Sequence, residues 1–133
     1  MSEAAAGLPT LISFHGELDR VNPFTGSGGD YWQQSVPDAL VAWAQHHGHE
    51  ATPTEVSSPN DHVQCIRYGQ GPGRLELHVV DDLGHIWPGY PRALGAPLDP
   101  PSSALDATGY LMRVFAEHWP CGDVLSDQSK GTW

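Results

Sequence analysis

The order of strand and helix signals along this 133-residue sequence predicts an α/β fold, with parallel strands and flanking helices. One strand signal follows Pro9 and another runs from Arg74 to Val80, with a helix signal between them and a second helix signal near the C-terminus. A helix that connects two strands of one sheet favours a parallel arrangement of those strands. With 39% hydrophobic residues, the chain is expected to form one domain with a normal core.

The first strand is predicted from Leu8 to Phe14, a short apolar run with Pro9 at its start. It is expected to end at His15-Gly16. The polar segment from Glu17 to Phe24 then continues into a glycine-rich stretch up to Asp30. Loops of this length in a compact domain often carry function.

A helix is predicted to begin after Ser35, which serves as the N-cap, with Asp38 three residues on. Gly48 is the expected end of this helix. Its sheet-facing stripe follows helical spacing and comprises Val36, Leu40, Trp43, Ala44 and His47. Residues 49 to 60 are rich in Pro, Ser and Thr and are expected to form a surface connection.

A hairpin is predicted from the strand Val63 to Tyr68 and the strand Arg74 to Val80, joined by the Gly/Pro-rich turn 69–73. In the second strand, Leu75, Leu77 and Val79 alternate with Glu76, His78 and Val80. Such alternation is typical of a strand with two different faces.

The segment from Tyr90 to Pro101 contains four prolines and is expected to be a loop or lid. The last helix is predicted from about Ser103 to His118, with a capping-box-like start that pairs Ser103 with Asp106. Its predicted apolar stripe comprises Leu105, Met112, Phe115 and Trp119. We therefore expect a lead-in at residues 1–8, one domain at residues 9–119 and a tail at residues 120–133.

The charge balance argues against two classes of partner. Six Lys and Arg face 16 Asp and Glu, and the formal charge of −10 repels both nucleic acid and an anionic membrane surface. Residues 1–7 lack the basic and apolar regions of a signal peptide, so none is expected, and the localisation stays open. Cys65 and Cys121 are compatible with one disulfide, but their spacing does not require it.

The segment Asp82 to Gly89 places one histidine, His85, in a tight loop directly after a strand. Gly84 frees the backbone before His85, and Pro88 prevents a regular element from continuing. In α/β sheets, functional residues gather at the carboxyl ends of the strands, where His15, Asp19 and His85 all fall. His85 is thus a candidate functional residue, with a turn residue packed beside Trp87 as the alternative.

Two segments resemble the polyhydroxybutyrate depolymerase and feruloyl esterase group of α/β-hydrolases. Leu11 to Phe24, LISFHGELDRVNPF, resembles the acid segment of that group, and Leu75 to Gly89, LELHVVDDLGHIWPG, is similar to its catalytic-histidine segment. The His-x-Trp-Pro-Gly motif is the most specific element. The resemblance implies that Asp19 is the acid and His85 the base of a Ser-Asp-His triad.

The two helices complete the resemblance. Ser35 to Gly48 resembles the helix that follows the acid segment, and Asp106-Ala107-Thr108 with Phe115 resembles the closing helix. Nearly all of residues 9 to 119 are covered, which implies the C-terminal half of an α/β-hydrolase fold. Relatives often carry a Cys after the helix glycine in a position to pair with Cys65, whereas this chain has His49, so that disulfide is not expected.

The nucleophile of such a triad is missing from the sequence. A serine elbow needs the pattern GxSxG, and none of the ten serines has glycines at both positions. Ser27, in Thr-Gly-Ser-Gly-Gly, comes nearest but lies in the loop after Asp19. The early strands expected to carry the oxyanion hole are absent too.

Other interpretations of the candidate residues stay open. Asp19 is alternatively a loop carboxylate that pairs with Arg20, and His15 a strand-end histidine with satisfied hydrogen bonds or part of an oxyanion loop. Trp87 and Tyr90 are candidates for lining an acyl or aryl pocket. The histidines at positions 46, 47, 49 and 62, with Asp61, could bind zinc adventitiously, but a helix end favours such side chains for its dipole, and neither a metal nor a cofactor is expected.

Three functions compete. The first is a carboxylic-ester hydrolase component whose serine comes from another chain or a missing N-terminal part. The second is a serine-independent enzyme in which His85, oriented by Asp19, is a general base. The third is a noncatalytic interaction module. A short sheet also leaves an exposed edge, so self-association or a partner chain is expected in addition to an ester substrate.

Overall fold

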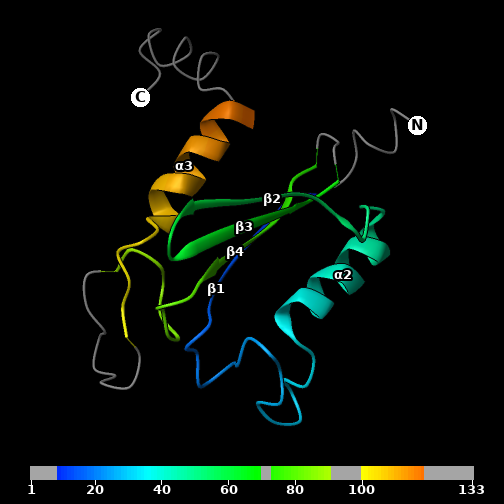
Figure 1. Cartoon of the computed structure of the whole chain (residues 1–133). Helices are drawn as coiled ribbons and strands as arrows, with labels where there is room; N and C mark the ends of the chain where they lie inside the picture. Colours follow the sequence, from blue (N-terminus) through cyan, green and yellow to red (C-terminus); the bar gives the residue numbers. More distant parts are fainter. Residues whose placement is uncertain (1–8, 70–72, 91–99, 119–133) are drawn as a thin grey trace, which may run out of the picture.

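The computed structural model describes residues 9–69, 73–90 and 100–118. They form a mixed four-stranded sheet in the order β1-β4-β3-β2, with one helix on each face, which confirms the predicted α/β character (Figure 1). The strands are β1 (Leu11–Gly16), β2 (Pro53–Asn60), β3 (Val63–Tyr68) and β4 (Leu75–Val80); the helices are α2 (Val36–His47) and α3 (Ala107–His118).

The pairing of the central strands agrees with the sequence. β1 pairs in parallel with β4, from Leu11 opposite Leu75 to Gly16 opposite Val80, and β3 pairs antiparallel with β4 as the predicted hairpin. β1 runs two residues beyond the predicted end and includes His15-Gly16. In the strand order β1-β4-β3-β2, the two edge strands are β1 and β2.

Helix α2 begins and ends as predicted. The Ser35 hydroxyl accepts a hydrogen bond from the Asp38 amide at 3.2 Å, and Gly48 adopts a φ of 84°, a left-handed conformation that favours glycine. Val36, Leu40 and Ala44 are buried against the sheet. They pack into one core cluster with Leu75, Leu77 and Val79 of β4.

Helix α3 differs from its prediction at the start and in its buried face. The predicted Ser103 cap is wrong, because the helix begins at Ala107 and the Asp106 carboxylate accepts the Gly109 amide at 3.0 Å. The predicted stripe is wrong as well, since Met112 and Phe115 are exposed. The face that α3 turns to the sheet has Ala107 and Val114 buried and Tyr110 half-buried. Trp119 lies outside the described residues.

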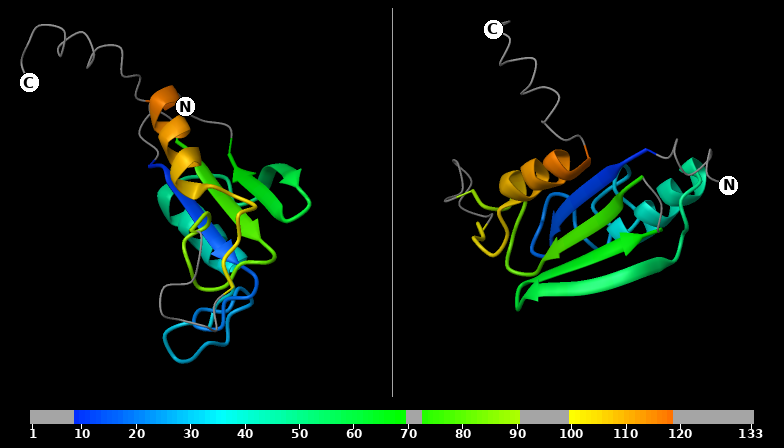
Figure 2. Two further views of the ribbon diagram at one scale, coloured as in Figure 1. Left: turned by 90° about the vertical axis from the view of Figure 1, so that its left-hand side faces the viewer. Right: turned by 90° about the horizontal axis from the view of Figure 1, so that it is seen from above.

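The expected surface connection at residues 49–60 is also wrong, because Pro53–Asn60 forms the edge strand β2. Every residue of β2 is exposed, and its pairing with β3 is interrupted by two register shifts. A strand exposed on both faces needs no apolar alternation, so its sequence carries no period-2 signal. Figure 2 shows β2 at the side of the sheet farthest from β1.

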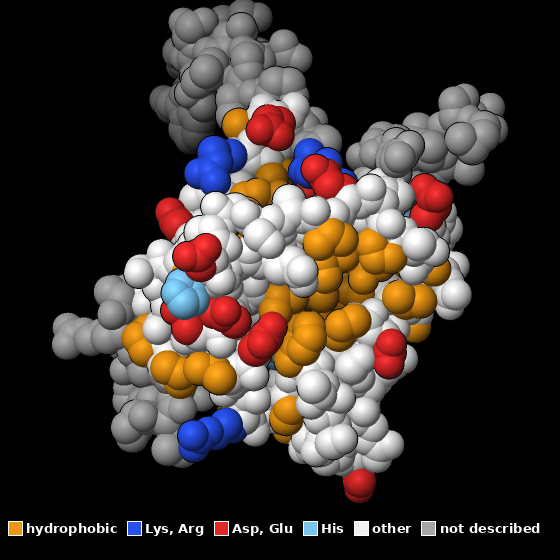
Figure 3. Space-filling view, viewed as in Figure 1, with side chains coloured by type: hydrophobic (Ala, Val, Ile, Leu, Met, Phe, Trp, Pro, Cys, Tyr) orange, Lys and Arg blue, Asp and Glu red, His pale blue; other side chains and the backbone are white. Residues whose placement is uncertain are grey.

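The two faces of the sheet are unequally covered. Figure 3 shows hydrophobic side chains gathered over α2 and the neighbouring part of the sheet, with acidic side chains beside them. α3 covers the opposite face over β1 and β4, where its Tyr110 contacts the rings of Phe14 and His78.

Among the described residues, no helix is long and apolar enough to cross a membrane. The turn 70–72, most of the proposed lid (residues 91–99), Cys121 and both predicted terminal segments lie outside the described residues.

Candidate functional site

The candidate site lies where the two parallel strands end. Asp19 follows β1 by three residues and His85 follows β4 by five, so both loops leave the same edge of the sheet. Gly16 lets these loops meet, because a Cβ at this position would lie 2.1 Å from the Leu83 carbonyl oxygen. The backbone of the loop after β1 also bonds to this carbonyl, through the Leu18 amide at 2.9 Å. The glycine of the His-Gly pair is thus required by the close approach of the two backbones.

Asp19 is buried, with 7% of its surface exposed, and its two carboxylate oxygens have different hydrogen-bond partners. Oδ1 accepts the backbone amides of Val21 at 2.9 Å and Asn22 at 2.8 Å, which fixes the carboxylate within its own loop. Oδ2 faces His85. The carboxylate pairs with this distant histidine rather than with the neighbouring Arg20.

His85 donates from Nδ1 to Asp19 Oδ2 at 2.9 Å. This bond, which we call the Asp19–His85 dyad, holds the tautomer in which Nδ1 carries the proton and Nε2 is the basic atom. The imidazole side chain is 45% exposed while its carboxylate partner is 5% exposed. A buried acid that orients an accessible imidazole is the arrangement that general-base chemistry requires.

His15 supports the same carboxylate. Its Nε2 lies 2.7 Å from the Asn22 carbonyl oxygen and 3.5 Å from Asp19 Oδ2. Its ring stacks on Trp32 with centroids 5.9 Å apart. These contacts describe a histidine with satisfied hydrogen bonds that braces the loop after β1.

The dyad borders an open cavity of about 420 Å³. Its walls comprise Phe14, His15, Gly16, Asp19, Asn22, Trp32, Gly84, His85, Ile86, Trp87 and Pro88. Trp87 lies in the wall, where its indole nitrogen donates to the Thr108 hydroxyl at 3.0 Å. Tyr90 lies outside these walls; its backbone amide bonds to the Trp87 carbonyl at 3.1 Å.

The described walls of this cavity contain no serine, threonine, cysteine or lysine that could attack a carbonyl carbon. Ser27, the nearest to an elbow serine in the sequence, is the one described non-glycine residue with a positive φ, at 68°. Its loop conformation is strained, but it is not part of the cavity wall. The described residues therefore bring together an acid and a base without a nucleophile.

A second polar group, which the sequence analysis did not single out, is buried under α3. Glu76 and His78 are 0% and 2% exposed on β4, and Cys65 faces them from β3. Their alternation with Leu75, Leu77 and Val79 resembles a solvent-facing pattern, yet α3 covers them. The sequence signal for this group is a Glu and a His at alternate positions of a strand whose other residues are all apolar. The structure buries this strand along its whole length.

Potential metal ligands gather at two places among the described residues, and neither is the histidine cluster at positions 46–49. One group is Cys65, Glu76 and His78; the other is the exposed group His62, Asp81 and Asp82. His49 instead reaches the Pro9 carbonyl oxygen at 2.7 Å from its Nε2. Cys65 has a free thiol.

Comparison of the chain with protein-family models, curated proteins and solved structures found no match in any of the three.

Proposed function

We propose that this chain is a component of a carboxylic-ester hydrolase of the α/β-hydrolase type, in which Asp19 and His85 act on a serine from another chain or another part of the polypeptide. The observation that carries the proposal is the dyad itself, with His85 Nδ1 2.9 Å from a buried carboxylate oxygen in the wall of an open cavity. The two residues are 66 positions apart, so only the fold brings them together.

The dyad supplies the acid–base half of ester hydrolysis. His85 Nε2 takes the serine hydroxyl proton as the serine oxygen bonds to the ester carbonyl carbon, and the imidazolium then returns that proton to the departing alcohol. A water molecule then attacks the acyl-enzyme with the same two proton transfers through His85, which releases the carboxylic acid and the free serine. Asp19 stays ionised throughout and stabilises the transient imidazolium.

The surroundings support a serine that comes from outside the described residues. Among the described residues, the cavity wall contains no serine, threonine, cysteine or lysine, and it lies at the carboxyl end of β1, an edge strand of the sheet. A further strand paired with β1 would end beside the same cavity, which is where the serine of the triad is needed.

A second function, hydrolysis without a serine, is favoured by one feature of the cavity. Asn22 Oδ1 is buried in its wall and has no hydrogen-bond partner within the described structure. Because this oxygen is buried, it would bind a donor of a ligand after the Asn22 amide turns into the cavity, with His85 as general base on water.

The test is labelling of the native assembly with a biotinylated fluorophosphonate, which reacts only with activated serines. The assembly is purified through an affinity tag on this chain, as wild type and as His85→Ala. We expect a label on a serine outside the described residues, and we expect at least a hundredfold slower labelling with His85→Ala, because the general base is lost.

His62→Ala is the matched control. His62 also pairs with a carboxylate, at 2.8 Å from Asp81, but both side chains are exposed and lie outside the cavity. The proposal requires that this variant labels as fast as wild type. An unlabelled wild-type assembly that hydrolyses p-nitrophenyl esters would favour the serine-independent function, and a label that survives His85→Ala would overturn the proposed base.

A further inference from the structure

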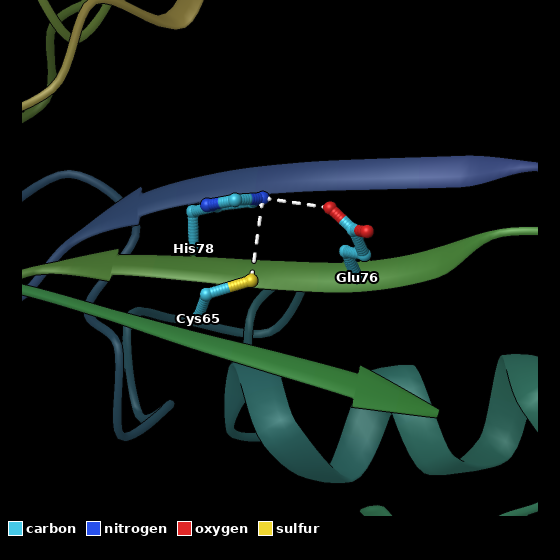
Figure 4. A group of neighbouring side chains, drawn as sticks. All are labelled: Cys65, Glu76 and His78. Atoms are coloured by element: carbon cyan, nitrogen blue, oxygen red, sulfur yellow. Dashed lines mark hydrogen bonds and ion pairs between the residues drawn. The ribbon is translucent and has the colours of Figure 1, made fainter. Parts of the chain in front are cut away.

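The buried group under α3 contains three ligand-type side chains, and the contacts of Glu76 and Cys65 meet at the ring of His78 (Figure 4). Glu76 and His78 point to the same face of β4, and Cys65 lies directly opposite His78 in the antiparallel register of β3. His78 Nε2 is 2.9 Å from Glu76 Oε1 and 3.7 Å from Cys65 Sγ. This group is independent of the Asp19–His85 dyad and of the function proposed for it.

Glu76 Oε1 and Cys65 Sγ both approach the same ring nitrogen of His78, and the Tyr110 hydroxyl donates to the same Glu76 oxygen. The Glu76 carboxylate accepts a hydrogen bond from His78 Nε2. The Cys65 sulfur then faces a nitrogen whose one proton is already engaged.

The same geometry argues against a thiol nucleophile. A Cys-His-carboxylate triad uses opposite nitrogens of the imidazole, one for the acid and one for the thiol, whereas here both contacts fall on Nε2. Burial and the Glu76 charge also raise the pKa of the Cys65 thiol to about 11. A reactive cysteine needs the opposite environment.

We propose that Cys65, Glu76 and His78 form a three-ligand site for a borderline divalent transition-metal ion, with zinc as the best fit. One ion between the three side chains would bind a sulfur, an oxygen and a nitrogen, whereas the proton between His78 and Glu76 joins only two of them. The three atoms lie within 4.8 Å of one another. In a tetrahedral zinc site, with bonds of about 2.0 to 2.3 Å, neighbouring ligand atoms are separated by about 3.3 to 3.5 Å, between the two distances observed here.

The donor set selects the class of metal. A thiolate with an imidazole and a carboxylate suits zinc or cobalt(II), whereas magnesium and calcium prefer oxygen ligands throughout. Binding releases the thiol proton and requires the His78 proton to move from Nε2 to Nδ1, and Cys65, Glu76 and His78 leave a fourth tetrahedral position for water. The ion would cross-link β3 to β4.

Neighbouring side chains fix the orientation of His78 and Glu76. The ring of His78 is held between Phe14, at 5.0 Å between centroids, and Tyr110, at 4.5 Å. Arg67 and Arg74 both bind Glu76 Oε2, whereas Oε1, on the His78 side, accepts the Tyr110 hydroxyl and would share this bond with the ion. Outer contacts of this kind orient metal ligands, although the two guanidinium charges also lower the affinity for a cation.

Access to the site is provided by the uncovered part of the sheet. Cys65 is partly exposed, and its neighbour in the outer strand is Ser57 of β2, a strand that is exposed along its whole length. An ion can therefore reach the sulfur from the β2 side without displacement of α3.

The experiment is a titration of the full chain with cobalt(II), whose bond to a thiolate gives a charge-transfer band in the near ultraviolet. We expect this band to saturate at one equivalent, with visible bands of tetrahedral cobalt, and to disappear when zinc is added. Cys65→Ser should abolish the charge-transfer band. This partly exposed, nearly isosteric change is expected to leave the fold intact, as measured by circular dichroism.

Cys121→Ser is the matched control and should keep the full band. Exposed histidines that bind cobalt adventitiously give no thiolate band, so they do not imitate the result. Zinc should also slow alkylation of Cys65 by iodoacetamide at least tenfold. A band that survives Cys65→Ser, a band lost in Cys121→Ser, or no saturable binding in wild type would each overturn the proposal.

Discussion

Two carboxylate–histidine pairs with the same separation have different surroundings in this molecule. Asp19 lies 2.9 Å from His85, and Glu76 lies 2.9 Å from His78. The His85 side chain is 45% exposed and borders a cavity, whereas the His78 side chain is 2% exposed and lies between two rings. The distance between the carboxylate and the imidazole therefore does not distinguish the two pairs, whereas the exposure of the imidazole to solvent does.

The two carboxylates are also neutralised in different ways. Backbone amides hold Asp19, so its position depends on one loop and its charge is available to His85. Two guanidinium groups and a tyrosine hydroxyl hold Glu76, so its charge ties β3, β4 and α3 together. We expect mutations to affect reactivity at the first pair and stability at the second.

The largest effect is expected from Asp19→Asn on hydrolysis by the serine-bearing assembly. Asn keeps an oxygen for the two backbone amides but presents an amide NH₂ to His85, which forces the proton to Nε2 and removes the base. We expect kcat for p-nitrophenyl esters to fall about 10⁴-fold, and the free energy of unfolding of the chain to fall by no more than about 2 kcal/mol.

Asp81→Asn is the matched change for this comparison, because Asp81 is the carboxylate of an exposed pair. It should leave kcat unchanged. Activity within tenfold of wild type for Asp19→Asn would show that the tautomer of His85 is not under the control of Asp19.

The next effect is expected from Glu76→Gln on stability. The change leaves Arg67 and Arg74 facing a neutral amide in place of their buried counter-charge, which costs about 3 to 5 kcal/mol at neutral pH. The pKa of Glu76 is lowered from 4.5 to about 2. A lowered carboxyl pKa stabilises the folded state above the unfolded pKa, so this contribution is lost as the pH falls from about 5 towards 2.

Urea unfolding of wild type and Glu76→Gln at pH values from about 3 to 7 measures this difference. We expect the two curves to converge on the acid side. Glu55→Gln is the control, because Glu55 also pairs with Arg67, at 3.4 Å, but is exposed; its effect should stay within about 1 kcal/mol. A constant gap between wild type and Glu76→Gln would mean that the Glu76 charge does not stabilise the fold.

The sequence predicted most of the fold because local signals and tertiary packing agree there. The Ser35 cap, the Gly48 end and the period-2 pattern of β4 each have a direct structural counterpart. The failures occur where tertiary context decides. β2 is exposed on both faces and lacks a pattern, and α3 presents Tyr110 and Val114 to the sheet rather than Met112 and Phe115.

The candidate site was predicted in part. Asp19 and His85 follow two parallel strands, so their approach follows from the topology. The Glu76–His78 pair escaped prediction because polar side chains at alternate positions of a strand indicate a solvated face, unless a helix is known to cover them. The register that brings Cys65 opposite His78 depends on the hairpin pairing, which the composition of either strand alone does not determine.

The smallest effect is expected at a third pair, His62 with Asp81, 2.8 Å apart and exposed. The hydrogen bond from His62 to Asp81 and the charge of Asp82 raise the pKa of His62 above 6.5. A raised histidine pKa stabilises the folded state below the unfolded pKa and loses that effect as the pH rises through the folded pKa. His62→Ala should therefore lower the thermal midpoint slightly at pH about 5.5 and leave it unchanged at pH about 9.

Differential scanning fluorimetry of His62→Ala at these two pH values checks the prediction. A drop in the midpoint as large as that of Glu76→Gln would contradict it, because solvent screens an exposed pair at any separation. If the three pairs rank as expected, separations of 2.8 to 2.9 Å accompany three different outcomes. Burial of both partners would then determine stability, and burial of the acid alone would determine reactivity.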